Sequence, residues 1–106
     1  MNETTNTPKK PTRKPDPMAQ IINELRTEIK KLDEMSTLEY PTTRVRAYDE
    51  RASAWGRQYG KEGTTDGLIL SLSFEALACY PHERRYSLVS LAAAALIAAE
   101  RISEGQ

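Results

Sequence analysis

The 106-residue sequence has few of the residues on which covalent links and metal sites are usually built. It contains one cysteine, Cys79, and one histidine, His82. A single cysteine cannot form a disulfide within the chain, and the two residues together are too few for a cysteine–histidine zinc site. We expect Cys79, which lies in an apolar stretch, to be a small buried hydrophobic residue, and His82 to lie at the surface or to cap a helix.

Net charge and long apolar runs are also missing. Fifteen basic and fifteen acidic side chains give a formal net charge of zero, so the bulk charge does not indicate nucleic acid. No segment reaches the roughly 18 apolar residues of a membrane-spanning helix, and the polar N-terminus lacks the apolar core of a secretory signal. We therefore expect a cytoplasmic protein without a membrane partner.

Residues 1–15 have the composition of a disordered arm. They contain three prolines, four basic side chains and no large apolar residue after Met1. Such a segment cannot bury enough apolar surface to offset the entropy lost on ordering. We interpret it as a solubilising tail, and a basic tether for nucleic acid is the alternative. Residues 16–106 then form a single helical domain.

The first helical pattern begins at Asp16-Pro17, a favourable helix start, and extends to about Met35. Its apolar residues form one stripe with heptad spacing: Met18, Ile22, Leu25, Ile29 and Leu32. A parallel pair of such helices would set Glu28 against Asp33 of its neighbour, where like charges repel. We therefore expect the stripe to pack on the core of its own domain rather than to form a free-standing zipper.

Two further helices are predicted in the middle of the chain. One covers 42–59, with Thr42 or Thr43 as its cap and Gly60 at its end. Residues 67–80 alternate in a way that also suits a strand. No other stretch supplies a partner strand, so a helix is predicted there as well.

The last predicted helix, Tyr86 to Ile102, is the one around which the others are expected to pack. Its residues from Tyr86 to Ala99 carry no charge, and apolar residues occupy more than one of its faces. A helix that is apolar nearly all round needs protein or lipid around it, and this one is too short for a bilayer. We expect it to be the water-excluded centre of the domain, enclosed by the other three helices.

The fold class follows from these elements. Tyr-Pro occurs at 40–41 and again at 80–81, which suggests two helical hairpins, each bent at a proline. The predicted fold is all-α, a compact four-helix bundle of two stacked hairpins with a disordered N-terminal arm. Because a core of this size gives only modest stability, we expect a homo-oligomer.

Basic side chains near one glycine-rich loop are the candidates for binding an anion. Arginine binds phosphate in a bidentate manner, and several arginines lie off the apolar seam of the second helix. The loop, 60–67, has three glycines but lacks the lysine and hydroxyl pair of a phosphate-binding P-loop. Solvated helix faces and a flexible connection are the alternatives. The candidate binding residues are six basic side chains and one acidic residue of the loop, Asp66. The basic ones are Arg44, Arg51, Arg57, Lys61, Arg84 and Arg85.

No set of side chains indicates nucleophilic catalysis, a cysteine–histidine metal site or a dinucleotide fold. Carboxylates on neighbouring helices can hold magnesium, which prefers oxygen ligands, and surface salt bridges are the alternative interpretation. The candidate ligands are Glu50, Asp66 and Glu75. The leading interpretation has no cofactor, and Mg²⁺ enters only in the enzymatic one.

A series of short motifs runs through the second half of the chain: Glu50-Arg51, Gln58, Glu62-Gly63, Asp66-Gly67, Ala78-Cys79-Tyr80, Arg84-Arg85, Leu88-Val89 and residues 95–102. Over 50–102 this order resembles small phage- and prophage-borne helical proteins of the MazG-like and dATP/dGTP pyrophosphohydrolase type. The resemblance implies a Mg²⁺-dependent nucleotide pyrophosphohydrolase with the metal on the three candidate carboxylates. Arg51 or Arg57 would bind the phosphates.

The chain departs from this family in two places. Ser53 stands where a third acid is expected, and a short Thr64-Thr65-Asp66 loop replaces an acidic, histidine-rich one. These departures favour a small non-catalytic binding or inhibitory protein, of the kind that phages and mobile elements carry, which engages a host protein or a nucleotide. The alternatives are the pyrophosphohydrolase and a nucleic-acid accessory protein. The expected partners are a host protein or a second copy of the chain, then a nucleotide, with nucleic acid last.

Overall fold

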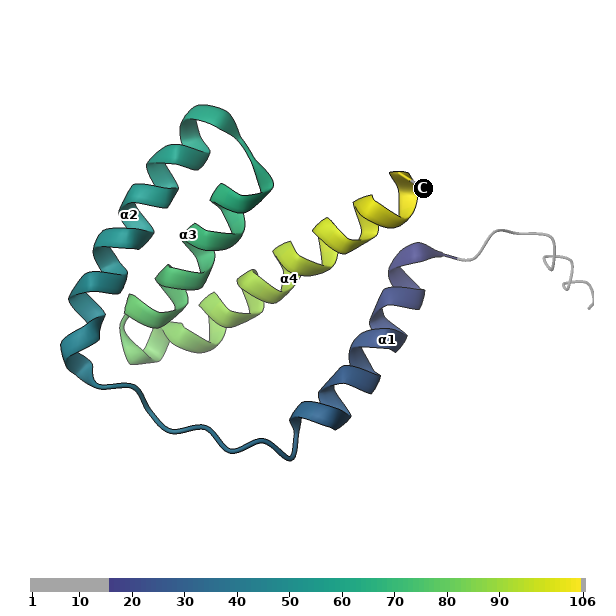
Figure 1. Ribbon diagram of the computed structural model, residues 1–106, viewed down its shortest axis with the longest axis horizontal. Helices are drawn as coiled ribbons and strands as arrows, with labels where there is room; N and C mark the ends of the chain where they lie inside the picture. Colours follow the sequence, from purple (N-terminus) through teal and green to yellow (C-terminus); the bar gives the residue numbers. More distant parts are fainter. Residues whose placement is uncertain (1–15, 106) are drawn as a thin grey trace, which may run out of the picture.

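The computed structural model describes residues 16–105; the predicted arm, 1–15, lies outside this range. The described chain has four α-helices and one short 3₁₀ turn, and it has no strand (Figure 1). The elements are α1 (Pro17–Leu32), η2 (Thr42–Arg44), α2 (Val45–Glu62), α3 (Thr65–Ala78) and α4 (Pro81–Gly105). The all-α, four-helix fold class is confirmed, and the ambiguous stretch 67–74 is helical.

The start of α1 follows the predicted capping chemistry. The Asp16 carboxylate accepts a hydrogen bond from the backbone N–H of Met18 at 3.1 Å, and Pro17 occupies the first helical position. The helix ends at Leu32, three residues before the predicted end at Met35. The remaining residues up to Pro41 connect α1 to the rest of the chain.

The caps predicted for α2 are wrong at both ends. Thr42 and Thr43 lie in the 3₁₀ turn, and Arg44 precedes α2 without a side-chain cap. Gly60 lies inside the helix, which continues through Glu62. The left-handed residue is Gly63, with φ of 64°, and its N–H donates to the Tyr59 carbonyl at 2.7 Å. Lys61 and Glu62 are good helix formers, so the helix runs on to the next glycine that can reverse the chain.

Small residues bring α2 and α3 into close contact. A two-residue turn, Gly63–Thr64, joins them, and Gly67 lies so near α2 that an added Cβ would stand 3.3 Å from the Tyr59 Cα. Ala52 of α2 is 9% exposed and Ala76 of α3 is fully buried. These alanines are the buried apolar residues of the described chain, in which no large side chain is fully buried. These small residues therefore allow the two helices to pack closely at their positions.

The pairing of the other helices differs from two stacked hairpins. In the described chain, α1 contacts α4 and not α2, while α3 lies between α2 and α4 (Figure 1). The extended segment 35–41 separates α1 from α2. Tyr40 anchors the end of this segment, because its hydroxyl donates to the Leu77 carbonyl at 2.7 Å. Pro41 then directs the chain into η2, so α1 is held away from the helix that follows it.

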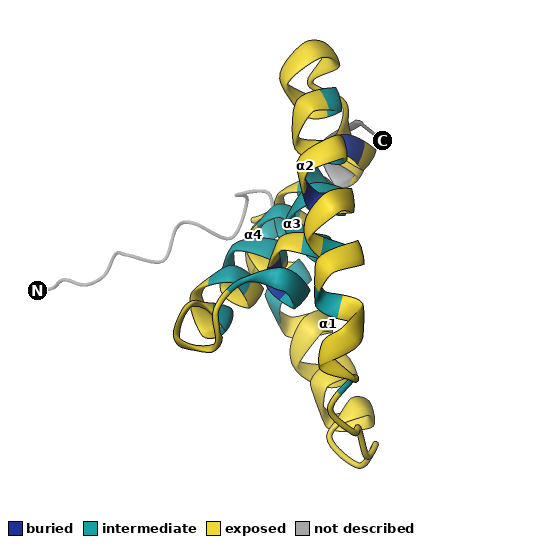
Figure 2. Cartoon of the chain, turned by 90° about the vertical axis from the view of Figure 1, so that its left-hand side faces the viewer, coloured by how far each residue is buried: buried dark blue, intermediate teal, exposed yellow. Residues whose placement is uncertain are grey.

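The central helix is α3 rather than α4. Figure 2 shows buried and intermediate residues gathered on α3 and on the sides of the helices that face it, with most of α1 exposed. No residue of α4 up to Ile102 is buried, and Val89 is 55% exposed. The prediction that the last helix is water-excluded is therefore wrong for the single chain, because only α3 and α1 lie against it. Cys79, predicted to be buried, is half-buried.

The longest helix of the described chain is α4, with 25 residues. Among the residues that the structure describes, no helix is both long and apolar enough to cross a bilayer.

Candidate protein-binding surface

Two of the predicted anion-binding arginines hold the fold together instead. The rings of Tyr40, Tyr48 and Phe74 follow one another with centroids 5.9 Å apart in both pairs. The Arg84 guanidinium lies 5.3 Å from the Tyr40 ring centroid, and the Arg51 guanidinium lies 5.9 Å from that of Phe74. Both contacts have cation–π geometry. This cluster joins the linker, α2, α3 and the start of α4, which gives both arginines a structural role.

Arg84 is further occupied by the linker. Its Nη1 donates to the Glu39 carboxylate at 3.2 Å, and 30% of its side chain is exposed, against 83% for Glu39. Its Nε is buried and has no hydrogen-bond partner among the described residues. The guanidinium thus contacts Glu39 and Tyr40 of the linker, and these contacts leave little of it accessible to a ligand.

The remaining basic candidates are exposed but do not converge. Arg44 lies in η2, before α2 begins. At 100° per residue, Arg57 and Lys61 lie on the side of α2 away from Arg51. Arg85 is on α4, which does not contact α2. Their exposure agrees with the alternative interpretation of solvated helix faces. A single phosphate site built from the seven candidates is not formed.

The three candidate magnesium ligands are also kept apart. Asp66 and Glu75 are both on α3 but nine residues apart, which is about 14 Å along a helix. Glu50 lies 3.6 Å from Arg46 on the exposed side of α2. Among the described residues, no group of three or more acidic, histidine or cysteine side chains is placed to hold a metal ion. The residues present therefore do not fit the magnesium centre that the enzymatic hypothesis requires.

Asp66 has a local role at the start of α3. Hydrogen bonds from the Thr64 side chain and from the Gly67 backbone N–H hold the pKa of its carboxyl below the ordinary value of 3.8. The carboxylate lies in the first turn, where the helix dipole favours negative charge. Thr64 occupies the N-cap position of α3.

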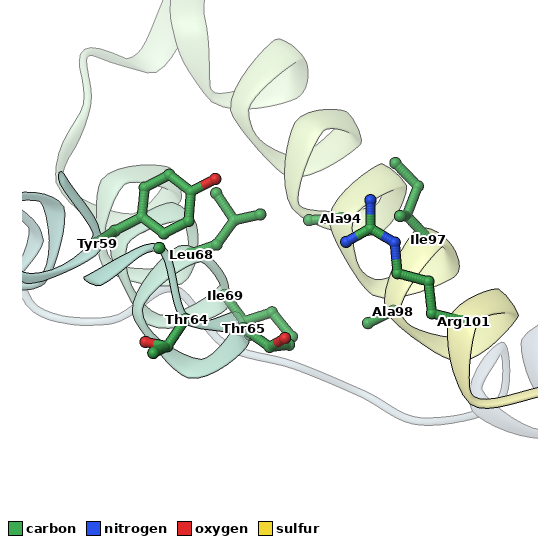
Figure 3. A pocket seen from close by; sticks show the side chains of 10 residues that line it. Tyr59, Thr64, Thr65, Leu68, Ile69, Ala94, Ile97, Ala98 and Arg101 are labelled. Atoms are coloured by element: carbon green, nitrogen blue, oxygen red, sulfur yellow. The ribbon is translucent and has the colours of Figure 1, made fainter. Parts of the chain in front are cut away.

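A small cavity lies between the α2–α3 turn and α4 (Figure 3). Its volume is about 160 Å³, and Leu68, Ile69, Ala94 and Ile97 supply apolar walls. Arg101 extends from α4 toward the side where Tyr59 and Leu68 lie (Figure 3). The sequence pattern did not single out Arg101, although its spacing from Ala94 and Ile97 places it on the same side of the helix. The cavity carries no pair of acidic and nucleophilic groups.

The second half of α1 presents an apolar stripe to solvent. The exposure of the stripe rises along the helix. Met18 and Ile22 are half-buried. Leu25, Ile29 and Leu32 are 37%, 54% and 59% exposed. These last three residues are called the α1 stripe below. The linker continues the trend, with Met35 at 64% and Leu38 at 94%. The sequence identified the stripe but assigned it to the core.

A second apolar face lies on the first half of α4. Leu88, Val89, Ala92 and Ala93 are exposed and fall within about 140° of one side of the helix. These four residues are called the α4 face below. The half-buried residues that point toward α3 lie on the opposite side, namely Ser87, Leu91, Ala94 and Ala98. Farther along the same side as the α4 face, Leu96 and Glu100 are half-buried. α1 contacts α4 and begins near the C-terminal end of that helix (Figure 1).

Comparisons of the chain with protein-family models, with curated proteins and with solved structures find no match. The function is therefore inferred from the residues and surfaces of the chain itself.

Proposed function

We propose that this protein is a small non-catalytic binding protein that inserts the α1 stripe into an apolar groove of another protein. The observation that carries the proposal is the rising exposure of the stripe, from 37% at Leu25 to 59% at Leu32. A strongly amphipathic helix normally buries such residues. Here, among the described residues, α1 contacts α4 alone, and the three residues of the stripe remain exposed.

The spacing of the stripe fits a known mode of recognition. Leu25, Ile29 and Leu32 stand at i, i+4 and i+7, which is the spacing of anchors that an amphipathic helix places in a groove. Covering the parts of these side chains that are still exposed would contribute roughly 2–4 kcal/mol. Met35 and Leu38 extend the apolar surface into the linker. A groove that is lined by apolar residues and about two helical turns long is the expected counterpart of the stripe.

Charges beside the stripe favour a partner other than a second copy. A parallel pair of α1 helices sets Glu28 against Asp33. An antiparallel pair centred on Thr27 sets Arg26 against Arg26 on one flank and Glu28 against Glu28 on the other. Like charges at such flanking positions select against self-pairing. The partner we propose for this surface is therefore a different protein, from the cell in which the chain is made.

Substitution of the stripe tests this proposal. The triple variant Leu25→Gln, Ile29→Gln, Leu32→Gln removes the apolar anchors and keeps good helix formers. The matched control, Glu24→Gln, Thr27→Gln, Lys31→Gln, places three glutamines on the polar side and leaves the net charge unchanged. With the tagged protein as bait in host extract, we expect wild type and control to retain the same protein and the stripe variant to lose it at least tenfold.

Circular dichroism shows whether both variants keep their helix content. Retention of the captured protein by a folded stripe variant would contradict the proposal. So would an extract from which wild type retains nothing beyond what the stripe variant retains.

A further inference from the structure

We propose that the α4 face is the docking site for a second copy of this chain, with the two α4 helices antiparallel across a two-fold axis. This goes beyond the proposed function and uses a different surface. Leu88 is 45% exposed and Val89 is 55% exposed, although they belong to a run of residues without charge. A helix of this composition needs protein on every side, and α3 covers only the opposite one.

The charge pattern around the face suits self-pairing, in contrast to the α1 stripe. From Tyr86 to Ala99 the helix carries no charged side chain, so two copies can approach there without ionic repulsion. The nearest charge on this side is Arg85. A parallel pair would place the two Arg85 side chains together. An antiparallel pair centred between Ser90 and Leu91 separates them by about 16 Å along the axis, beyond the screening length of about 8 Å at physiological salt.

The shape of the face is also self-complementary in this arrangement. With the centre between Ser90 and Leu91, Leu88 lies opposite Ala93 of the second copy, and Val89 lies opposite Ala92 of the second copy. Large residues thus meet small ones at each level, which lets two helix axes approach to about 8–10 Å. An isologous interface requires this property, because the same patch must fit itself.

The extent of the face sets the expected strength. α1 covers the same side of α4 farther along, where Leu96 is half-buried, so the contact is limited to about two turns on each copy. Such a contact lies at the low end of specific interfaces. We therefore expect a dimer with a micromolar dissociation constant rather than an obligate one.

Sedimentation across a hundredfold concentration range, starting at low micromolar, tests the proposal on the full chain. We expect a shift from monomer to dimer. Val89→Glu places a carboxylate near the two-fold axis and should weaken the dimer at least tenfold, as should Ala92→Lys. Both positions are exposed, so each variant should keep its helix content by circular dichroism.

Mixing the two variants tests the antiparallel arrangement. Because Val89 faces Ala92 of the second copy, the Val89→Glu and Ala92→Lys chains should form a heterodimer at least fivefold tighter than either variant alone. A parallel pair would not bring these positions together. A mixture no tighter than its components overturns the antiparallel docking.

The α1 stripe variant keeps this test separate from the proposed function. It should dimerise like wild type, because its substitutions lie outside the α4 face. A chain that stays monomeric over the whole range, or a dimer that survives Val89→Glu, overturns the α4 proposal and leaves the α1 proposal standing. A dimer lost in the stripe variant also overturns it, because self-association would then use α1.

Discussion

The α2–α3 hairpin and the α1–α4 pair both bring apolar helix faces together, but they do so to different extents. In the hairpin, Gly67 and Ala76 let the helices approach until a Cβ on the glycine would meet the Tyr59 backbone. In the α1–α4 pair, large aliphatic side chains remain exposed on both helices. Two residues join the helices of the hairpin, whereas residues 33–44, which include η2, join α1 to α2. The partner helix of α1, α4, lies far from it in the sequence.

This difference indicates where stability and binding are placed in the chain. A short turn and small facing residues close the hairpin without needing a partner. A long connection leaves α1 and α4 with apolar area that the single chain does not cover, and such area marks interaction sites in soluble proteins. The hairpin, with the aromatic cluster at its open end, is therefore the more closely packed part, and the α1–α4 pair carries the exposed apolar surfaces.

Enlarging the buried alanine of the hairpin should have the largest effect on stability. Ala76→Leu adds volume at a position with 0% exposure and is expected to lower the free energy of unfolding by roughly 2–3 kcal/mol through overpacking. Ala54→Leu, at an exposed position of α2, should change it by less than about 0.5 kcal/mol. Urea denaturation followed by circular dichroism measures both.

The opposite change in size, on α1, should have a much smaller effect on stability. Leu32→Ala removes side-chain volume from a residue that is 59% exposed, so we expect a loss below about 1 kcal/mol. If Leu32→Ala destabilised the chain as much as Ala76→Leu, the stripe would be part of the folded core, and the contrast between the two regions would fail.

The turn of the hairpin should give the next largest effect. Gly63→Ala forces a residue with a Cβ into a left-handed conformation, at φ of 64°, and should cost about 1 kcal/mol. Gly60→Ala, inside α2 with nothing within 4 Å of the added Cβ, should stabilise the protein by up to about 1 kcal/mol. Opposite shifts in melting temperature for the two variants are expected. Shifts of the same sign would contradict the position of the cap.

Acidification should give the smallest effect. The folded-state pKa of Asp66 lies below 3.8, so its hydrogen bonds stabilise the folded protein above that pH, and this contribution is lost as the pH falls through the folded-state pKa. Asp66→Asn should therefore lose less stability than wild type between pH 5 and pH 3. Urea midpoints at the two pH values measure the difference. An equal loss in both proteins would show that Asp66 does not contribute.

Several features of the fold could be predicted because they depend on neighbouring residues. The Asp16-Pro17 start, the break at Tyr80-Pro81 and the helical state of 67–74 follow from capping, proline geometry and the lack of a partner strand. The sequence predicts Gly60 as the end of α2, but the left-handed residue is Gly63, and glycine permits that conformation at either position. What distinguishes them is where the chain must turn so that α3 packs on α2.

The candidate site was less predictable. Arg51 and Arg84 looked like free cations in the sequence, and only the fold brings them against Phe74 and Tyr40. Glu50, Asp66 and Glu75 are possible metal ligands by residue type. Their positions along α2 and α3 keep the three carboxylates apart, and no metal-binding group forms among the described residues. Residue type shows what a side chain can bind, but convergence depends on helices that are distant in sequence.

The helical residues and the apolar positions on each helix can be read from the amino-acid order, because both depend on short-range periodicity and on capping. Which apolar face is covered depends on how the helices pack. Their packing places α3 in the middle, and it leaves Leu25 to Leu32 and Leu88 to Ala93 partly or wholly uncovered. The physical reason is that burial depends on how closely the connections let distant helices approach, and the extended segment 35–41 keeps α1 from closing over α4 along its whole length.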